Sequence, residues 1–170
     1  MLDVAVQVET GWPDEDWEAL AEQAVSAALS ASPFAKLAAS PACVEVSVRL
    51  TADAEVQTLN AAYRGKDKPT NVLSFPMVQP DLLDGLDATD DGEVLLGDIV
   101  LAHGVVLAEA EEKGIPVRDH ATHLVVHGLL HLLGYDHQGT DEAEAMESLE
   151  RAAMARLGLA DPYRDHDHGG

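Results

Sequence analysis

The chain has 170 residues, of which 46% are hydrophobic, and its 31 acidic and 10 basic residues give a net charge of −21. This length and hydrophobic content are typical of one folded domain with its own core. The charge excludes a protein that holds nucleic acid on a broad basic surface, because affinity for phosphates comes from Lys and Arg. We therefore expect neither DNA nor an anionic membrane among its partners.

The sequence also bears on domain organisation and location. No apolar run approaches the ~18 residues needed to cross a bilayer, and residues 1–4 have neither the basic start nor the apolar core of a signal peptide. We therefore expect a cytoplasmic protein. Residues 1–160 are predicted to form a single domain, and residues 161–170 a flexible, charged tail.

Hydrophobic periodicity predicts four strands and five helices. In chain order they are a strand at 3–9, a helix from 14 or 15 to 29, a strand at 43–50, a helix to about 63, strands at 71–78 and 94–101, and helices at 102–113, 116–133 and 140–157. Thr51 is expected to cap the second helix, Pro76 to place its strand at a sheet edge or bulge, and Gly97 to interrupt the last strand. The predicted fold class is α+β: a single, metallohydrolase-like domain with a small four-stranded mixed sheet covered by about five helices.

The segment HGLLHLLGYDH at residues 127–137 places three histidines in an apolar stretch that is typical of a buried helix. His127 and His131 lie one helical turn apart, a spacing at which two imidazoles can bind one metal ion. Gly134 can end the helix in a left-handed conformation, after which the chain can bring His137 back as a third ligand. Three imidazoles would leave a fourth position open for water, as in catalytic zinc sites.

The alternative is that these are core histidines whose rings are satisfied by hydrogen bonds. Leaving three buried rings unpaired would destabilise the fold by about 1–3 kcal/mol each. A shared cation removes that penalty, so we prefer the metal interpretation for His127, His131 and His137. His123, one turn earlier, is expected to support the ligands, whereas His120 is more simply explained as a core histidine.

The position after the first ligand separates this segment from zinc proteases of similar spacing. Proteases with the pattern H-E-x-x-H-x-x-G-x-x-H use the glutamate as the general base that activates water. Here Gly128 takes its place and cannot accept a proton. The missing base argues against peptide hydrolysis and favours phosphodiester cleavage, in which a cation stabilises the charged transition state.

The densest positive cluster of the chain is Arg64, Lys66 and Lys68, in a loop that Gly65 and Pro69 predict. It is not a phosphate-binding P-loop, because the pattern G-x-x-x-x-G-K-[ST] is absent. Taken alone, such a cluster is more often a solvated turn. Its interpretation therefore depends on the sequence around it.

Three motifs, in this order and spacing, closely resemble the bacterial YbeY family: LNAAYRGKDKPTNVLSFP at 59–76, GDIV at 97–100 and HLVVHGLLHLLGYDH at 123–137. The similarity continues into MESLE at 146–150 and covers most of the chain. It implies a single-strand-specific, metal-dependent endoribonuclease. The implied role is maturation of the 3′ end of small-subunit rRNA, together with ribosome quality control.

By motif position, the resemblance assigns three zinc ligands: His127, His131 and His137. One Zn²⁺ per chain is expected, although nickel would also suit three imidazoles. The implied partners are rRNA and the small ribosomal subunit. A basic ribosomal protein is a further candidate, because the acidic surface would attract it.

The resemblance also assigns Arg64 as the functionally important arginine of an RNA-facing cleft. Its planar guanidinium would hold a phosphate and stabilise charge that develops during cleavage. Lys66 and Lys68 would contribute to substrate binding by charge alone. The nucleophile, a bound water or a ribose 2′-hydroxyl, is left open.

Two features depart from the family pattern. The acidic loop at residues 81–93 is longer than expected and would repel RNA if it lay near the cleft; it does not match the calcium-binding EF-hand loop. His166 and His168, in the tail, match no family feature and are expected to be part of a mobile segment.

Two other functions are compatible with the residues. One is a ribosome-assembly factor that binds rRNA or a ribosomal protein, with a structural metal and no hydrolytic role. The other is a metallopeptidase, against which Gly128 already counts. Loss of RNA cleavage in a ligand variant that keeps its fold and its partner would favour the enzyme.

Overall fold

The computed structural model describes residues 2–9, 11–33, 35, 43–68, 70–77, 93–135, 140–159 and 162. This part of the chain contains four strands and five helices in the predicted order. They are β1 (Leu2–Val8), α1 (Trp17–Ala31), β2 (Cys43–Thr51), α3 (Asp53–Arg64), β3 (Val72–Pro76), β4 (Glu93–Ala102), α5 (His103–Lys113), α6 (Val117–Leu132) and α7 (Thr140–Arg156). The predicted α+β fold class is confirmed.

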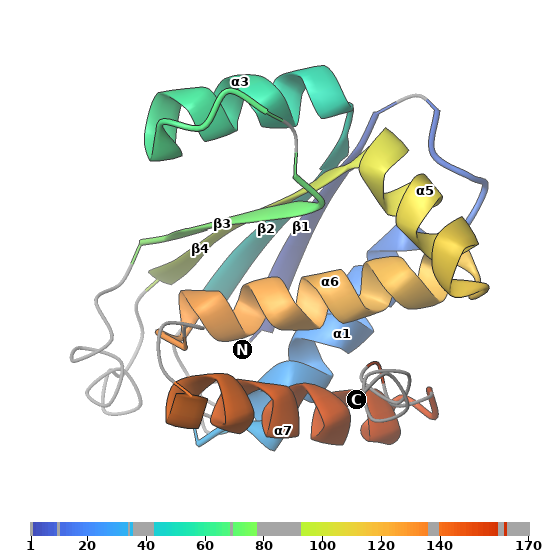
Figure 1. Ribbon diagram of the computed structural model, residues 1–170. Helices are drawn as coiled ribbons and strands as arrows, with labels where there is room; N and C mark the ends of the chain where they lie inside the picture. The colour runs from blue at the N-terminus through green and yellow to red at the C-terminus, as the bar shows by residue number, and fades with distance from the viewer. Residues whose placement is uncertain are drawn as a thin grey trace.

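The strands form one mixed sheet in the order β1-β2-β4-β3 (Figure 1). Both β1 and β4 run parallel to β2, and β3 runs antiparallel to β4. The edge strands are β1 and β3, and the last residue of β3, Pro76, lies opposite Gly97. An edge position fits a proline, which has no N–H to offer the ladder, so the prediction made from Pro76 is confirmed.

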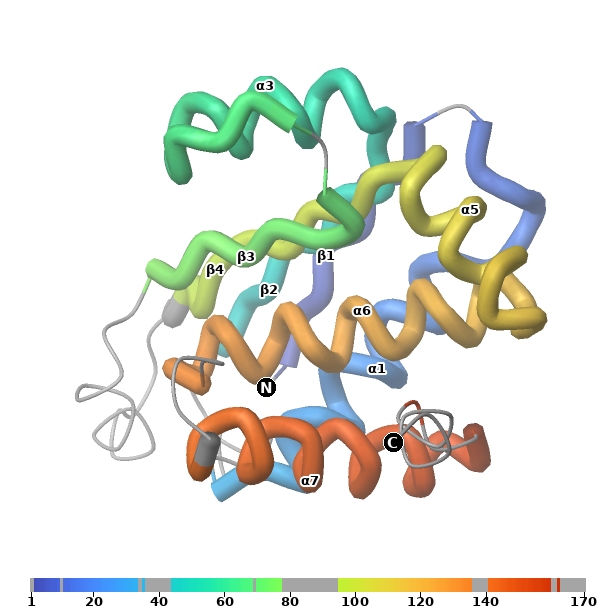
Figure 2. Tube along the Cα trace, viewed as in Figure 1, coloured from blue at the N-terminus to red at the C-terminus, as the bar shows by residue number. Residues whose placement is uncertain are grey.

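The two faces of the sheet carry different layers, because successive strand residues point to opposite faces. Val44, Val46 and Val48 of β2 are buried in the main core with side chains of α1 and α6. Ser47 and Arg49, which alternate with them, point to the other face, where α3 packs over β3 and β4. Beyond the first face, α7 contacts α1 and α6, and α5 lies at one end of the molecule (Figures 1 and 2).

A second, smaller cluster holds α3 on the sheet. Val56 of α3 packs with Leu73, Val100 and Ala102, and all four side chains are buried. Among the described helices, α1 and α6 both cover the main-core face of the sheet. On the opposite face, α3 alone spans β3 and β4 (Figure 1). The α3 face is therefore the less completely covered of the two.

The predicted interruption of the last strand at Gly97 is replaced by a β-bulge. The strand β4 continues through Gly97, and its register against β2 shifts between Glu45 and Val46. Gly97 has φ +150°, and a Cβ built there would lie 2.3 Å from the carbonyl oxygen of Phe75 and 2.7 Å from Cδ2 of Leu132. Glycine is needed here because β3, β4 and α6 meet too closely for a side chain.

Two helix starts differ from the prediction. Thr51 does not cap α3: it is the last residue of β2, and Ala52 takes the N-cap position without a side-chain hydrogen bond. The Thr51 hydroxyl instead donates a hydrogen bond to the carboxylate of Glu55. The helix α1 begins at Trp17, later than predicted, because Asp16 is its N-cap and accepts a hydrogen bond from a first-turn amide at 3.2 Å.

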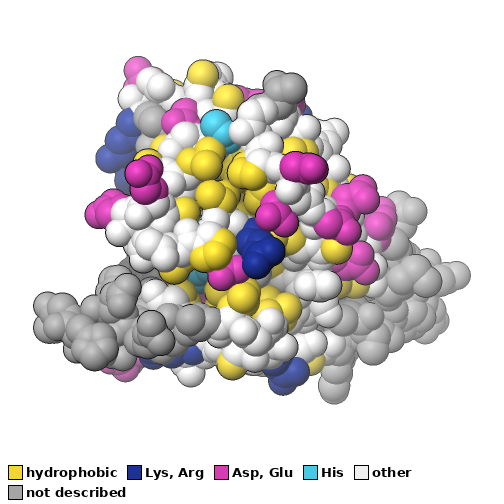
Figure 3. All heavy atoms as spheres, turned by 90° about the vertical axis from the view of Figure 1, so that its right-hand side faces the viewer, with side chains coloured by type: hydrophobic (Ala, Val, Ile, Leu, Met, Phe, Trp, Pro, Cys, Tyr) yellow, Lys and Arg dark blue, Asp and Glu magenta, His cyan; other side chains and the backbone are white. Residues whose placement is uncertain are grey.

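Within the described residues, no helix combines the length and the hydropathy required to cross a bilayer. The face in Figure 3 carries several groups of Asp and Glu side chains and fewer of Lys or Arg, as the composition predicts. The acidic loop at 81–93 lies outside the described residues except for Glu93, and so does the tail at 161–170 except for Pro162. Statements about these segments stay predictions.

Candidate functional site

The predicted histidine stripe forms along α6. Ring centroids lie 6.4 Å apart for His120 and His123, 6.3 Å for His123 and His127, and 4.6 Å for His127 and His131. The leucine and valine side chains between these rings are buried in the main core. The spacing of three, four and four residues thus places all four rings on one side of the helix.

The last two rings of the stripe bring their nitrogens together. Nε2 of His127 lies 3.1 Å from Nε2 of His131, and both side chains are half-buried. Two nitrogen ligands of a tetrahedral Zn²⁺, each at ~2.0–2.1 Å from the metal, are separated by about 3.3 Å. The pair therefore fits one transition-metal ion bound by both rings.

A carboxylate from another helix supports this pair. Glu150 of α7 is fully buried, and its Oε1 accepts a hydrogen bond from Nδ1 of His127. Its Oε2 lies 3.5 Å from Nε2 of His123. With Nδ1 of His127 as the donor, Nε2 of that ring carries the lone pair and faces His131. A carboxylate in this position fixes the tautomer and orientation of a metal-ligating histidine.

The charge of Glu150 also suits a cation site. Burial alone would raise its pKa, but hydrogen bonds from His123 and His127 outweigh burial and lower the pKa of Glu150 to about 2. The carboxylate is therefore ionised at neutral pH and places a negative charge directly behind a candidate ligand.

Sequence reasoning missed the role of Glu150, which entered only as part of the MESLE motif. A signal was present: Met146, Glu150 and Ala153 are spaced by four and three residues, and all three are fully buried on α7. An acid within a buried helical stripe needs a hydrogen-bonding partner. The partner could not be identified from α7 alone.

The third predicted ligand, His137, lies outside the described residues. Within the described ranges, no group of three or more His, Cys, Asp or Glu side chains converges on a metal position. The helix ends as predicted, since Gly134 has φ +102° and the amide of Tyr135 donates to the carbonyl of Leu130 at 3.1 Å. The ligand set His127, His131 and His137 therefore stays a prediction, of which the structure brings two members together.

Packing against the sheet explains why residue 128 is a glycine. A Cβ built at this position would lie 2.8 Å from Cγ2 of Ile99 and 3.1 Å from Oγ of Ser74. Position 128 thus faces the sheet, with no room for a glutamate. The general base of the zinc proteases is therefore absent from this position for a structural reason, and the metallopeptidase alternative loses support.

The remaining buried histidine has a structural explanation, as the sequence suggests. His120 is 2% exposed, and its Nε2 lies 2.8 Å from Oε1 of Glu109. The same carboxylate accepts a hydrogen bond from Nδ2 of Asn71 at 3.1 Å. These contacts join α6, α5 and the segment that enters β3. The pKa of His120 is lowered, mainly because burial disfavours the charged ring, against the opposing effect of Glu109.

The basic cluster lies at the end of α3 and on the turn that follows it. Arg64, Lys66 and Lys68 are exposed, and none of them forms an ion pair with a carboxylate in the described part of the chain. The turn itself is well defined: Gly65 has φ +68°, and the buried Asn60 donates a hydrogen bond from Nδ2 to the carbonyl of Lys68 at 2.8 Å. The cluster is thus a structured turn with three accessible cations.

The edge strand β3 separates this cluster from the histidine pair. Tyr63, beside Arg64, packs against Phe75, with ring centroids 5.2 Å apart. The preceding strand residue, Ser74, lies against Gly128 of α6. Because neighbouring strand residues point to opposite faces, α3 and α6 lie on opposite sides of β3. The structure does not bring the basic cluster and the histidines into one pocket, so the roles of the basic residues stay predictions.

The fold and the histidine pair together define a small α+β domain with a candidate metal centre on a buried helix. A family model described as "Endoribonuclease YbeY" matches residues 4–158. Curated proteins of that name are 63% identical over 164 residues in Rhizorhabdus wittichii (96% of this chain, 97% of the relative) and 58% identical over 168 residues in Sphingopyxis alaskensis (98% and 100%). The chain therefore belongs to the YbeY endoribonuclease family, as its three motifs predict.

A solved structure has the same fold. The solution structure of TM1509 from Thermotoga maritima superposes with a TM-score of 0.53 and 23% sequence identity. The match covers 94% of this chain and 98% of that chain. At this identity the similarity concerns the fold alone, and it agrees with the α+β architecture predicted from the sequence.

Proposed function

We propose that this protein is a metal-dependent, single-strand-specific endoribonuclease that matures the 3′ end of small-subunit rRNA and acts in ribosome quality control. Membership of the YbeY endoribonuclease family supports RNA as the substrate. The observation that carries the metal dependence is the pair of Nε2 atoms of His127 and His131, 3.1 Å apart, with Glu150 behind His127. A cytoplasmic location and the small ribosomal subunit as partner belong to the same proposal.

The proposed metal is one Zn²⁺ per chain, with nickel as an alternative. His127, His131 and His137 would hold it, while Glu150 keeps the His127 ring in the tautomer that offers Nε2. When bound, the cation would supply positive charge to the scissile phosphodiester and acidify a water molecule. Position 128 offers no general base, so the proton of the nucleophile must leave by another route.

Arg64 is the proposed phosphate-binding residue. Its guanidinium is exposed and makes no ion pair with a described carboxylate, so it is available for a bidentate contact with a phosphate. Lys66 and Lys68 would add charge without comparable geometry. An RNA strand that reaches both the cluster and the histidine pair would pass around the edge strand β3.

The test is cleavage of precursor small-subunit rRNA by the purified protein. We expect Arg64→Ala to retain fold and metal but lose most cleavage, and Arg64→Lys to restore it only poorly, because a point charge does not replace a planar fork. Arg156→Ala, at the exposed end of α7, is the matched control and should cleave normally. Absence of cleavage by the unmodified protein under all metal conditions would favour the assembly-factor alternative.

The ends of the products identify the nucleophile. Attack by the ribose 2′-hydroxyl would leave a cyclic phosphate or a 3′-phosphate. Attack by water would leave the phosphate on one of the two products without a cyclic phosphate intermediate. The same assay therefore tests the activity and resolves the step that the sequence leaves open.

A further inference from the structure

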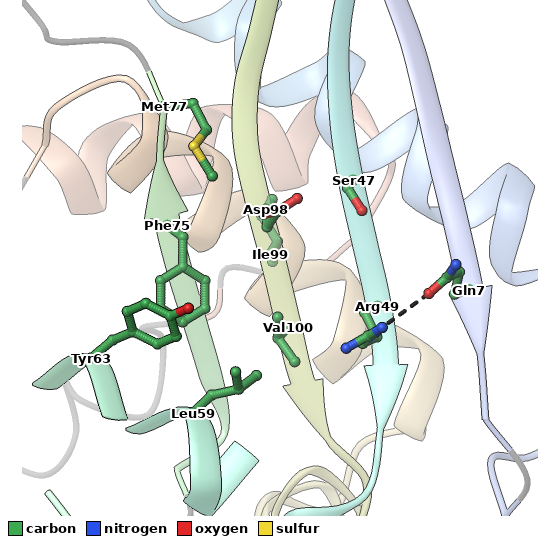
Figure 4. Close-up of a pocket in the computed structure, with 10 residues that line it drawn as sticks. All are labelled: Gln7, Ser47, Arg49, Leu59, Tyr63, Phe75, Met77, Asp98, Ile99 and Val100. Atoms are coloured by element: carbon green, nitrogen blue, oxygen red, sulfur yellow. Dashed lines mark hydrogen bonds between the residues drawn. The ribbon is translucent and has the colours of Figure 1, made fainter. Parts of the chain in front are cut away.

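A pocket of about 420 Å³ lies on the α3 face of the sheet, away from the histidine pair (Figure 4). Its volume is within the ~300–1,000 Å³ of ordinary ligand sites. We propose that this pocket binds one unpaired guanine base of the RNA substrate. The proposal rests on the endoribonuclease function above and names a specificity site for it.

One wall of the pocket is aromatic. Tyr63 of α3 and Phe75 of β3 meet edge to face, with ring centroids 5.2 Å apart and an interplanar angle of 62°. Tyr63 is 71% exposed and Met77, at the end of the same wall, is 56% exposed. Exposed aromatic rings beside a groove are the usual stacking surface for single-stranded bases, because every base has a π-face.

The floor of the pocket is polar and directly adjoins this wall. Phe75 is the register partner of Asp98, and Asp98 is the register partner of Ser47, so the three residues form one row across β3, β4 and β2. Directly opposite residues of antiparallel strands, such as Phe75 and Asp98, have side chains ~4.5–5.5 Å apart. Figure 4 shows the row leading from the two rings to Asp98 and Ser47. A base stacked on the rings would therefore present its edge to a carboxylate and a hydroxyl.

The chemistry of this edge selects guanine. The Asp98 carboxylate makes no hydrogen bond or ion pair with another described side chain, and an ionised carboxylate is an acceptor only. Guanine is the one common base with two adjacent donors on its pairing edge, N1–H and N2–H, which match one carboxylate. Its O6 acceptor would then face the donor Ser47.

The surrounding charges fit a base inside the pocket and its phosphates outside. Asp98 disfavours an anion within the pocket, whereas Arg64 follows Tyr63 directly at the exposed end of α3. Arg49, on the far side, is held by Glu55 and by Gln7, whose Oε1 accepts from its Nε at 3.3 Å. The far wall is thus fixed before any ligand binds, which reduces the entropy lost on binding.

The test uses the full chain and four 2′-O-methyl trinucleotides, UGU, UAU, UCU and UUU. They carry the same phosphates and differ only in the central base, so differences in affinity report base recognition. We expect UGU to bind on the order of 10-fold more tightly than the other three, the discrimination typical of a bidentate contact. Ring-current shifts of the Tyr63 and Phe75 NMR signals should accompany binding of UGU.

Two variants separate stacking from edge recognition. Tyr63→Leu keeps an apolar side chain but removes the ring, and it should lower the affinity for UGU by about 5-fold or more. Asp98→Asn should abolish the preference for UGU and leave UUU affinity unchanged. Ile115→Ala, at an exposed apolar position on the turn before α6, is the control and should bind like the unmodified chain. Thermal unfolding of each variant confirms that it is folded.

Equal affinity for all four trinucleotides, without shifts of the two rings, would overturn the proposal. Cleavage of precursor rRNA in the same preparation distinguishes the possible failures. Normal cleavage without base preference would reject the guanine pocket and leave the enzyme proposal intact. Selective UGU binding without any cleavage would support the pocket and reject the endoribonuclease function.

Discussion

A carboxylate without access to water needs polar partners: Glu150 accepts a hydrogen bond from Nδ1 of His127, and its other oxygen lies 3.5 Å from Nε2 of His123. Removing the charge while keeping the shape would leave the His127 ring less firmly oriented. The role proposed for Glu150 is therefore to position a ligand, while the histidines would bind the metal itself.

We predict that Glu150→Gln weakens metal binding by about 10- to 100-fold, the usual effect of losing a carboxylate behind a ligand histidine. Competition with a chromophoric chelator measures this affinity independently of RNA cleavage. Glu144→Gln, on the exposed side of α7, should bind metal normally. Equal affinity of the two variants would reject the positioning role.

The contribution of His120 to the stability of the fold should depend on pH. Nδ1 of His120 is buried and has no hydrogen-bond partner among the described residues. Protonation would add a buried N–H without an acceptor, next to the positive charge of Lys113. The pKa of His120 in the folded state is accordingly below the ordinary 6.5, mainly because of burial.

A group whose pKa is lowered by folding binds more protons in the unfolded chain over the intervening pH range. The stability that neutral His120 contributes is therefore complete above pH 6.5 and is lost as pH falls below it. We expect the stability difference between the unmodified chain and His120→Gln to decrease between pH 8 and pH 5.5, measured by urea denaturation. A difference that stays constant or grows on acidification would contradict this sign.

At the scale of elements, β3, β4 and α6 approach one another closely at Gly97. We predict that Gly97→Ala destabilises the fold by at least about 3 kcal/mol, because a disfavoured φ adds to a clash with the backbone of Phe75. Gly114→Ala is the control: its φ is +69°, but nothing lies within 4 Å of the added Cβ. It should destabilise by only about 1–2 kcal/mol, and equal losses would contradict the crowding at Gly97.

Periodicity was sufficient to predict the order of the strands and helices, because each of them buries one face and the apolar spacing records it. Details that depend on tertiary contacts were not predictable. The bulge at Gly97 results from the approach of Phe75 and Leu132, which are distant in the sequence. Threonine is a residue type that often caps helices, but the pairing of Thr51 with Ala102 keeps it in β2.

The candidate site likewise has a part that could be predicted from the sequence and a part that could not. His127 and His131 are four residues apart on one helix, so their contact follows from local geometry. Glu150 is 23 residues from His127 and reaches it only because α7 packs on α6. The row of Phe75, Asp98 and Ser47 likewise requires the strand order, which a single sequence does not reveal.

For the whole molecule, the net charge of −21 should oppose RNA at long range. Under the proposed function, attraction would come from the proposed cation and from Arg64, Lys66 and Lys68. We predict a shallow salt dependence for short rRNA fragments, with a log–log slope of magnitude about 2–3 instead of the ~6–10 of broad basic interfaces. Fluorescence anisotropy across a salt series measures it, and a steep slope would show that the positive surface lies elsewhere.

The most direct test of the metal-dependent endoribonuclease is metal content and rRNA cleavage measured on the same purified samples. The account predicts about one transition-metal ion per chain, lost together with cleavage in each of His127→Ala, His131→Ala and His137→Ala. His166→Ala, which changes a histidine outside the predicted ligand set, should retain both. Retention of a stoichiometric metal by all three ligand variants, or undiminished cleavage without it, would contradict the account.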